Sequence, residues 1–467
     1  MKVQIALLGA LLGVSGCMVG PDYKRPEVSL PAAFPESAPP KAATGAALRA
    51  DWWTLYEDKA LDELVASAME RNADVRLAVA RIEEAAANLR AANAAYFPEV
   101  DLLGNANRTL YSTTTALPVP PGVPALRNDV RLAPTTSFEI DFWGKLRRGV
   151  EGFRAQYLST RYARDVVLLT LAGSTAQTYF TLRMLDAQIA VSRESVANRQ
   201  ESLGFVRRRV EGGIATALEL AQAEGALADI ASQLKDQERQ RALAEHLLGT
   251  LTGRLDLKLV AGDLRKLPSP PLPPPGLPSS LLDRRPDIRQ AEQDLVNANA
   301  QIGVAKSALF PSISLTGFLG SESAGLSTLM RTGGAIWSLG FGLSLPIFDA
   351  GRYQARTDAA VARQRQALAG YQKSIETGFR EVADALVNLR QLSDAEADFE
   401  MRAGAARNAV RLSQLRYEAG YSPYLEVLDA QRNANDAESA LLRNRQAVLA
   451  SSVDLMKALG GGWTPQP

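Results

Sequence analysis

The sequence contains 467 residues, with 52 lysines and arginines against 51 aspartates and glutamates, one histidine and one cysteine. The formal charge of +1 provides no overall basic field of the kind that attracts nucleic acid. A single histidine and a single cysteine exclude a histidine-rich metal centre, an intramolecular disulfide and a cysteine-cluster zinc or iron–sulfur site. We therefore expect no metal and no cofactor.

The chain begins with a pattern typical of an exported bacterial lipoprotein. A short charged start and an apolar run precede Ser15-Gly16-Cys17. We interpret 1–16 as a cleaved signal peptide and Cys17 as the lipidated first residue of the segment 17–56. Met18 replaces the aspartate that would retain a lipoprotein in the inner membrane. Each buried methylene of an acyl chain adds about 0.8 kcal/mol of membrane affinity, so several chains form a durable anchor. The alternative is a cleaved signal beside an incidental cysteine.

Two sets of long helices follow, one in each half of the chain. They are rich in Ala, Arg, Glu and Leu, and Pro98 and Pro311 end the first helix of each set because proline cannot continue the helical ladder. The predicted helices cover 57–95, 145–211 and 216–251, and then 279–309, 352–418 and 422–459. At about 1.5 Å per residue, the longest predicted helices would each extend about 100 Å. Helices of this length pack side by side as coiled coils.

Between the first and second helix of each set, apolar and polar residues alternate as in β-strands. The alternation covers 100–102 and 137–142 in the first half, and 312–316 and 341–347 in the second. We predict one hairpin in each half, and therefore four strands per chain. One face is apolar and the opposite face carries carboxylates, as suits a wall between lipid and water. The alternative is an ordinary half-buried sheet on a soluble domain.

An exported and lipid-anchored chain favours the membrane interpretation of these strands. No apolar stretch after the signal reaches the roughly 18 residues of a spanning helix. Four strands cannot close a barrel, and an unpaired backbone group in lipid costs several kcal/mol. We therefore expect copies of the chain to complete the barrel with cyclic symmetry. Two copies would enclose almost no lumen, whereas three copies would form a twelve-stranded channel.

The second half of the sequence repeats the first. Residues 95–100 resemble 308–313, which lie 213 positions later. From Gly144, which matches Gly351, the spacing becomes 207 positions. We divide the chain into a signal peptide (1–16), a lipidated segment (17–56), a first repeat (57–267), a proline-rich linker (268–278), a second repeat (279–459) and a C-terminal tail (460–467).

Six short motifs extend the pattern: 16–23 (GCMVGPDY), 51–56 (DWWTLY), 284–289 (RRPDIR), 308–313 (ALFPSI), 416–420 (RYEAG) and 424–432 (YLEVLDAQR). With these motifs in this order, the chain resembles the outer-membrane factors of tripartite efflux pumps, the TolC/OprM class, and especially its lipoprotein branch. The resemblance covers essentially the whole mature chain.

The resemblance implies a homotrimer in which long antiparallel coiled-coil helices form an α-barrel and the strands form a twelve-stranded outer-membrane β-barrel. It also implies a mixed equatorial belt built in part from the chain ends. Such a channel is anchored in the outer membrane, extends into the periplasm and conducts small toxic solutes passively, as in multidrug resistance. Its partners would be a periplasmic adaptor, an inner-membrane pump that is commonly proton-driven, and outer-membrane lipid. Nucleic acid is not an expected partner.

The resemblance also places a gate at the helical turns, at the end of the tunnel opposite the strands. By position, Tyr417 matches the gate tyrosine, Arg416 its basic partner, and Asp429 and Glu426 the ring carboxylates. A carboxylate ring attracts cations and repels anions. The alternative for both acids is a helix-start role, because the helix dipole favours an acid in the first turn by about 0.3–1 kcal/mol. The turns themselves are marked by Gly213 and Gly420, since a helix end commonly needs a left-handed residue.

Three other functions compete with an efflux channel. An outer-membrane exit duct of a type I protein secretion system uses the same architecture, although the lipoprotein start and Trp52-Trp53 are typical of the pump-associated branch. A periplasmic coiled-coil scaffold without a pore would not insert its strands in lipid. An enzyme is the least expected class, because the sequence offers no nucleophile–base constellation.

Overall fold

A computed structural model provides the structure, and it describes residues 18–34, 49–112, 114–115, 119–120, 122–269 and 278–463. The predicted signal peptide, the predicted lipidation site Cys17, most of the proline-rich linker and the last four residues lie outside the described residues. The described residues separate into two compact units. The sheet unit draws on 18–27, 82–160 and 291–371, and the hairpin unit draws on the described parts of 28–81, 161–290 and 372–467.

Three of the predicted long helices match their predicted bounds to within two residues. They are α4 (Lys145–Glu211), α5 (Ala217–Leu251) and α10 (Tyr424–Ala458). Thr216 begins α5 through a capping box, in which its hydroxyl accepts from the Glu219 amide and the Glu219 carboxylate accepts from the Thr216 amide. In the described ranges, no helix has both the length and the hydropathy needed to cross a membrane.

The first helix of each set is interrupted, which corrects the predictions for 57–95 and 279–309. The first becomes α2 (Lys59–Arg71) and α3 (Ala73–Ala94), because the Asn72 side chain accepts from the Asp74 amide and holds Asn72 extended. The second becomes α6 (Leu281–Arg284) and α7 (Pro286–Ser307). Arg285 is extended between them, since a residue before proline avoids the helical region.

The predicted helix 352–418 is also divided, into α8 (Arg352–Asp394) and α9 (Glu396–Glu418). The amide of Asn444 on α10 donates to the Leu392 carbonyl at 3.1 Å. That carbonyl would otherwise accept from the Glu396 amide in a continuous helix. A side chain inserted into the helical ladder is a recognised cause of a break.

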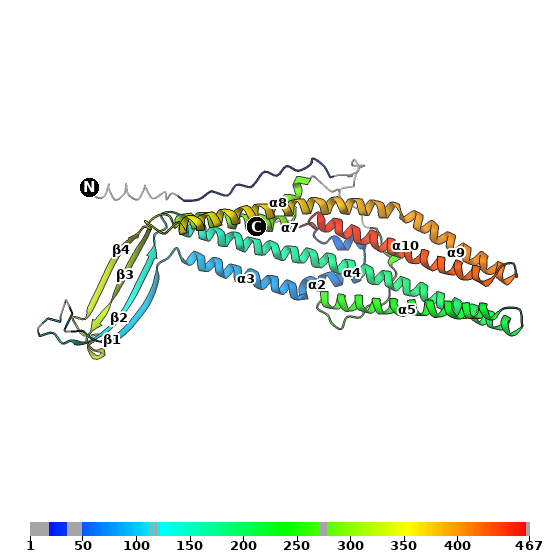
Figure 1. The fold of residues 1–467 in the computed structure, drawn as a ribbon, viewed down its shortest axis with the longest axis horizontal. Coiled ribbons are helices and arrows are strands. Elements are labelled where there is room, and N and C mark those ends of the chain that lie inside the picture. The colour runs from blue at the N-terminus through cyan, green and yellow to red at the C-terminus, as the bar shows by residue number, and fades with distance from the viewer. Residues whose placement is uncertain are drawn as a thin grey trace. The chain divides into compact units, whose positions relative to one another are not determined.

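The described residues form one antiparallel sheet of four strands, confirming the predicted number. The strands are β1 (Glu99–Leu110), β2 (Leu126–Glu139), β3 (Ser312–Ser323) and β4 (Ala335–Ser344). They lie side by side in chain order (Figure 1), so β1 and β4 are the two edges. The chain is thus mainly helical with a four-stranded sheet, as predicted.

The register of the sheet places most large apolar residues on one face and most charged residues on the other, with Arg108 and Asn128 on the first face and Leu103, Phe318 and Ile336 on the second as exceptions. Paired residues project to the same side, so each position fixes the face of its partners. One face, here called the apolar face, carries Val100, Leu102, Leu110, Leu132, Phe138, Ile313, Leu315, Leu319, Trp337, Leu339, Phe341 and Leu343. The opposite, polar face carries Glu99, Asp101, Asn105, Asn107, Arg131, Glu139, Ser314, Glu322, Ser338 and Ser344.

Two strands end earlier than predicted. β2 stops at Glu139, because the Asp141 carboxylate turns to accept from the Leu146 and Arg147 amides at the start of α4. β4 stops at Ser344, two residues before Pro346, which has no amide to donate. The predicted strand residues 140–142 and 345–347 therefore belong to the connections into the long helices.

The core of the hairpin unit explains the aromatic motif at 51–56. Trp52 and Tyr56 lie in a short 3-10 helix, η1 (Trp52–Tyr56), and are both fully buried. The Tyr56 hydroxyl bonds to that of Ser452 on α10 at 2.6 Å, and the Tyr56 ring packs on Phe180 of α4. This segment therefore joins α4 to α10 through aromatic packing.

Candidate functional site

The predicted turns occur where the sequence places them, and both have the same geometry. Gly213 and Gly420 adopt left-handed φ angles of 72° and 78°. In each turn, the amide of the next residue reaches the carbonyl five positions earlier, Ile214 to Arg209 and Tyr421 to Arg416. This pattern is the Schellman motif, which glycine permits because it has no Cβ.

The two helical hairpins, α4–α5 and α9–α10, pack together beside these turns. Figure 1 shows both turns at the same end of the hairpin unit. The contact is an apolar cluster, here called the tip cluster, of Val206, Ala223, Tyr417, Tyr424 and Val427, all buried. The first repeat supplies two members and the second repeat three. The two turns are therefore held together by apolar packing within a single chain.

Tyr417 lies at the centre of the tip cluster. Its ring centroid is 5.1 Å from that of Tyr424 and 6.2 Å from that of Phe205, and the Arg209 guanidinium lies 5.1 Å from the same centroid. Burial and the Glu219 carboxylate raise the pKa of Tyr417, and Arg209 only partly offsets them. The phenol is therefore neutral at physiological pH. Its buried hydroxyl has no hydrogen-bond partner among the described residues.

The three charged residues predicted for the gate lie on the surface near the turns. Arg416 on α9 pairs with Glu426 on α10, with an N–O distance of 3.5 Å. Asp429 pairs with Arg432 on its own helix at 3.1 Å. Glu426 lies in the first turn of α10, which agrees with the helix-start alternative.

Sequence reasoning missed Phe205 and Arg209, which complete the surroundings of Tyr417. Both lie in the last turns of α4, more than 200 positions before Tyr417 in the sequence. Their predicted helix offered no signal that these particular faces meet α9. The sequence indicated only that each repeat has a turn of the same kind, and not which residues of α4 lie beside Tyr417.

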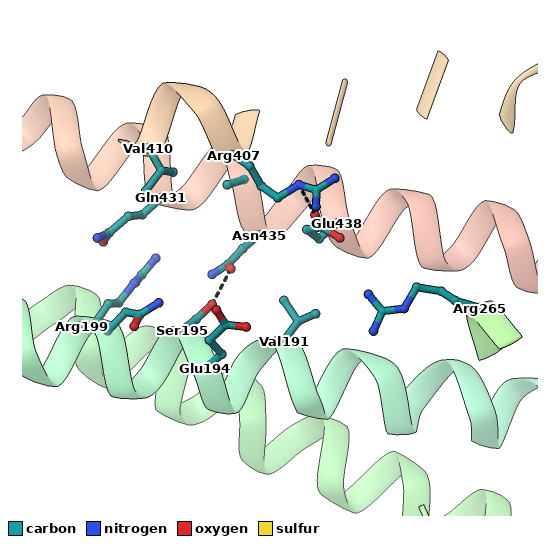
Figure 2. Close-up of a pocket in the computed structure, with 12 residues that line it drawn as sticks. Val191, Glu194, Ser195, Arg199, Arg265, Arg407, Val410, Gln431, Asn435 and Glu438 are labelled. Carbon is teal, nitrogen blue, oxygen red and sulfur yellow. Dashed lines mark hydrogen bonds and ion pairs between the residues drawn. The ribbon is translucent and has the colours of Figure 1, made fainter. Parts of the chain in front are cut away.

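A cavity of about 370 Å³ lies between α4, α9 and α10. Figure 2 shows the Ser195 hydroxyl donating to the Asn435 amide oxygen across it at 2.7 Å, and Arg407 paired with Glu438 on one wall. Arg199 is only 5% exposed, and burial lowers its pKa. Its guanidinium donates to a backbone carbonyl of α5 at 2.5 Å. Polar contacts thus replace apolar packing between the hairpins in this region.

A second feature lies in the sheet unit, where residues 18–27, here called the strap, cross the helices. The Val19 amide donates to the Trp143 carbonyl at 3.0 Å. Asp22 pairs with Arg148, which is almost fully buried, at 2.5 Å. A Cβ at Gly303 would lie 2.8 Å from the Val19 carbonyl oxygen, so the strap passes too close for a side chain. The first described residues are therefore fixed where β2 joins α4.

Replacing Tyr417 by Phe is expected to leave the fold intact and to raise the free energy of unfolding by about 1 kcal/mol. The reason is that a buried hydroxyl without a partner costs about 1–3 kcal/mol, and phenylalanine keeps the ring. Thermal unfolding of the purified protein measures the change. Tyr421→Phe, on the exposed side of the same turn, is the matched control. A lower stability for Tyr417→Phe would mean that the hydroxyl has a partner in the assembled protein.

The described residues contain no group of three or more His, Cys, Asp or Glu side chains arranged to hold a metal ion. The chemistry of the site is that of packed aromatic rings, ion pairs and turns. These contacts hold the two helical hairpins together beside the turns.

Comparison with known proteins identifies the family. The family model described as "Outer membrane efflux protein" matches residues 64–254 and 277–461. The chain is 33% identical over 456 residues to the cation efflux system protein CusC of Escherichia coli K12, with 97% of each chain covered. It is 34% identical over 483 residues to the probable efflux pump outer membrane protein TtgC of Pseudomonas putida, with 99% of this chain and 96% of the relative covered.

Solved structures agree over nearly the whole chain. The CmeC outer membrane channel of Campylobacter jejuni superposes with a TM-score of 0.90 at 26% identity, covering 96% of both chains. A crystal structure of CusC gives a TM-score of 0.84 at 31% identity, covering 96% of this chain and all of the other. The chain therefore belongs to the outer membrane efflux protein family.

Proposed function

We propose that this chain forms the outer-membrane exit duct of a tripartite efflux pump and conducts small solutes passively. The observation that carries the proposal is the sheet, which has one apolar face, one polar face and two edges without a partner in the chain. A sheet of this kind is stable in lipid only as part of a closed barrel with a polar interior. The duct makes and breaks no covalent bond.

The assembly we propose is a trimer, because three copies of four strands close a twelve-stranded barrel wide enough for a lumen. The long helices of the three copies continue the passage as an α-barrel into the periplasm. A periplasmic adaptor and an inner-membrane pump, commonly proton-driven, supply the solutes and the energy. Membership of the efflux family supports this arrangement over an exit duct for secreted proteins.

The lipid anchor we propose is attached to Cys17. Support comes from the strap, whose first residue, Met18, lies against Gly144 so closely that a Cβ there would come within 2.5 Å of the Met18 side chain. Gly144 is the residue where β2 passes into α4. An acylated residue next to Met18 would be held near the end of the sheet, where acyl chains reach the membrane.

The gate we propose lies at the helical turns and involves Arg416, Tyr417, Glu426 and Asp429. Support comes from the exposure of the three charged residues beside a buried aromatic cluster. Three copies of Asp429 facing the axis would form a carboxylate ring that attracts cations and narrows the passage. The ion pair between Arg416 and Glu426 would hold α9 against α10 in the closed state.

Replacing Asp429 by Ala is expected to increase single-channel conductance, because the change removes the proposed ring. Recordings in planar bilayers measure the effect. Asp429 is exposed and its ion pair is with its own helix, so the fold is expected to persist. Glu426→Ala serves as the comparison for a first-turn acid. Equal conductance of Asp429→Ala and the parent would mean that Asp429 is a solvated surface residue and not part of a gate.

Dye retention in cells tests the proposed function as a whole. Deletion of the gene in a strain with an active pump is expected to raise retention of a fluorescent efflux substrate, because the exit duct is lost. Restoring the gene on a plasmid is expected to return retention to the original level. Unchanged retention in the deletion strain, together with loss of a secreted protein from the medium, would favour the secretion duct instead.

A further inference from the structure

The repeat in the sequence reproduces the register of the sheet. In the first hairpin, Glu99 pairs with Ser137. Advancing Glu99 by 213 positions and Ser137 by 207, the spacings found in the sequence, gives Ser312 and Ser344. These two residues pair in the second hairpin. The two spacings found in the sequence therefore also relate the strand pairs of the two hairpins.

The contact between the two hairpins has no such counterpart within the chain. Val130 on β2 pairs with Ser323 on β3. Advancing Val130 by 207 positions gives Trp337 on β4, and moving Ser323 back by 213 gives Leu110 on β1. These strands are the two opposite edges of the sheet, so the same contact can form only between different copies.

We propose that β4 of one copy pairs antiparallel with β1 of the next, with Trp337 opposite Leu110 of the partner subunit and Ser344 opposite Leu103 of the partner subunit. The second pair follows in the same way from Ser137 and Thr316, which pair between β2 and β3. This register rests on the proposed function, since it requires the copies to share a barrel. The proposal specifies which residue of β4 lies opposite which residue of β1 in the next copy.

The proposed register keeps the two faces of the sheet continuous from copy to copy. Trp337 and Leu110 both belong to the apolar face, and both are about three-quarters exposed in the single chain, at 75% and 73%. Leu339, Phe341 and Leu343 fall opposite Arg108, Ala106 and Gly104 of the partner subunit, which project to the same face as Leu110. A slip of one residue would set Trp337, Leu339, Phe341 and Leu343 beside the polar face of the neighbouring strand. The register derived from the repeat therefore joins the apolar face of one copy to the apolar face of the next.

The ends of the strands extend the same argument to the residues beyond the sheet. Within the chain, Trp143 follows β2, donates to the Pro311 carbonyl at 2.8 Å and packs on Phe310, with centroids 4.7 Å apart. The repeat equivalent of Phe310 is Phe97, which precedes β1 and is 72% exposed. The segment that follows β4 carries Ile347, which is 94% exposed.

Phe348, the next residue, is 89% exposed. Within the chain, the Ile140 amide donates to the Ile313 carbonyl at 2.9 Å. The repeat equivalents of this pair are Ile347 and Val100, so Ile347 falls opposite Val100 of the partner subunit and Phe348 follows it. Ala350, the equivalent of Trp143, falls opposite Phe97 of the partner subunit. Apolar side chains that are almost fully exposed in the single chain are thereby covered by the next copy. Because β4 meets β1 and not another β4, the contact is heterologous and closes into a ring in which all copies point the same way.

Disulfide crosslinking tests the register directly. The variant Leu103→Cys/Ser344→Cys places its two thiols on directly opposite residues, which lie about 4.5–5.5 Å apart between Cα atoms, within the range for a disulfide. The matched controls, Asp101→Cys/Ser344→Cys and Asn105→Cys/Ser344→Cys, keep the same face but are displaced by two residues. Each variant is expressed in the full chain, and outer membranes are oxidised and analysed on denaturing gels. A second opposite pair, Thr109→Cys/Ser338→Cys, covers the case in which the first variant does not assemble.

We expect the two opposite pairs to give covalent dimers and trimers at least tenfold more rapidly than the displaced pairs. Variants that carry only one of the introduced cysteines are expected to give no covalent dimers or trimers. Faster crosslinking of a displaced pair would overturn the register while leaving the shared barrel in place. If no pair crosslinks and an amine-reactive crosslinker also yields only single chains, both the register and the proposed function are wrong.

Discussion

Replacing Leu339 by Arg is expected to keep the chain out of the outer membrane. Leu339 lies in the middle of β4, on the apolar face, and is 71% exposed in the single chain. An arginine on the lipid side of a barrel strand costs about 2–4 kcal/mol at the bilayer midplane, and a trimer would bear this cost three times. We expect the variant to be absent from the outer-membrane fraction and cells to retain efflux dyes.

Ser338→Arg is the matched control for this prediction. Ser338 immediately precedes Leu339 but belongs to the polar face, so its arginine would extend into the aqueous lumen. We expect Ser338→Arg to reach the outer membrane in near-normal amounts. Quantitative immunoblots of fractionated membranes compare the two variants. If both reach the outer membrane equally well, the apolar face does not contact lipid, and the sheet is the half-buried sheet of a soluble domain.

Replacing Arg285 by Ala is expected to destabilise the hairpin unit by about 3 kcal/mol, the lower end of the range for breaking a buried ion pair. The Arg285 side chain is 8% exposed and binds the Asp287 carboxylate through two nitrogens, at 3.0 and 2.7 Å. It also donates to Glu381 on α8 and to the carbonyl of Ala458 at the end of α10. The lower end applies because Glu381 is partly exposed and water would solvate it after the change.

Arg284→Ala separates this effect from a general loss of charge. Arg284 is the preceding residue and is exposed. We expect its removal to change the free energy of unfolding by less than about 0.5 kcal/mol, as for most surface substitutions. Thermal and denaturant unfolding in detergent measure both variants. Equal stability of the Arg285→Ala variant and the parent would show that the three-way contact contributes nothing to the fold.

The parts of the fold that depend on local chemistry were predictable from the sequence. The bounds of α4 follow from the absence of proline over 145–211, and the start of α5 follows from its capping box. The interruption at Arg285 also had a local signal, the following proline, which the prediction of one continuous helix overlooked. The break between α8 and α9 had none, because it depends on the Asn444 side chain of a different helix.

The candidate site was predictable only in part, for the same physical reason. The two glycine turns and the first-turn position of Glu426 are local features, and the structure places them as the sequence indicates. The burial of Tyr417 is not local, since it requires Phe205 and Arg209 from the other repeat. Whether Asp429 narrows a passage depends on copies of the chain that a single sequence cannot place.

The number of copies in the native particle tests the central claim most directly. Native mass spectrometry of the protein, extracted from outer membranes in mild detergent, measures the mass of the intact assembly. The account predicts a single species with the mass of three acylated chains. A monodisperse species with the mass of one chain, stable without detergent, would contradict it, because one chain has too few strands to close a barrel.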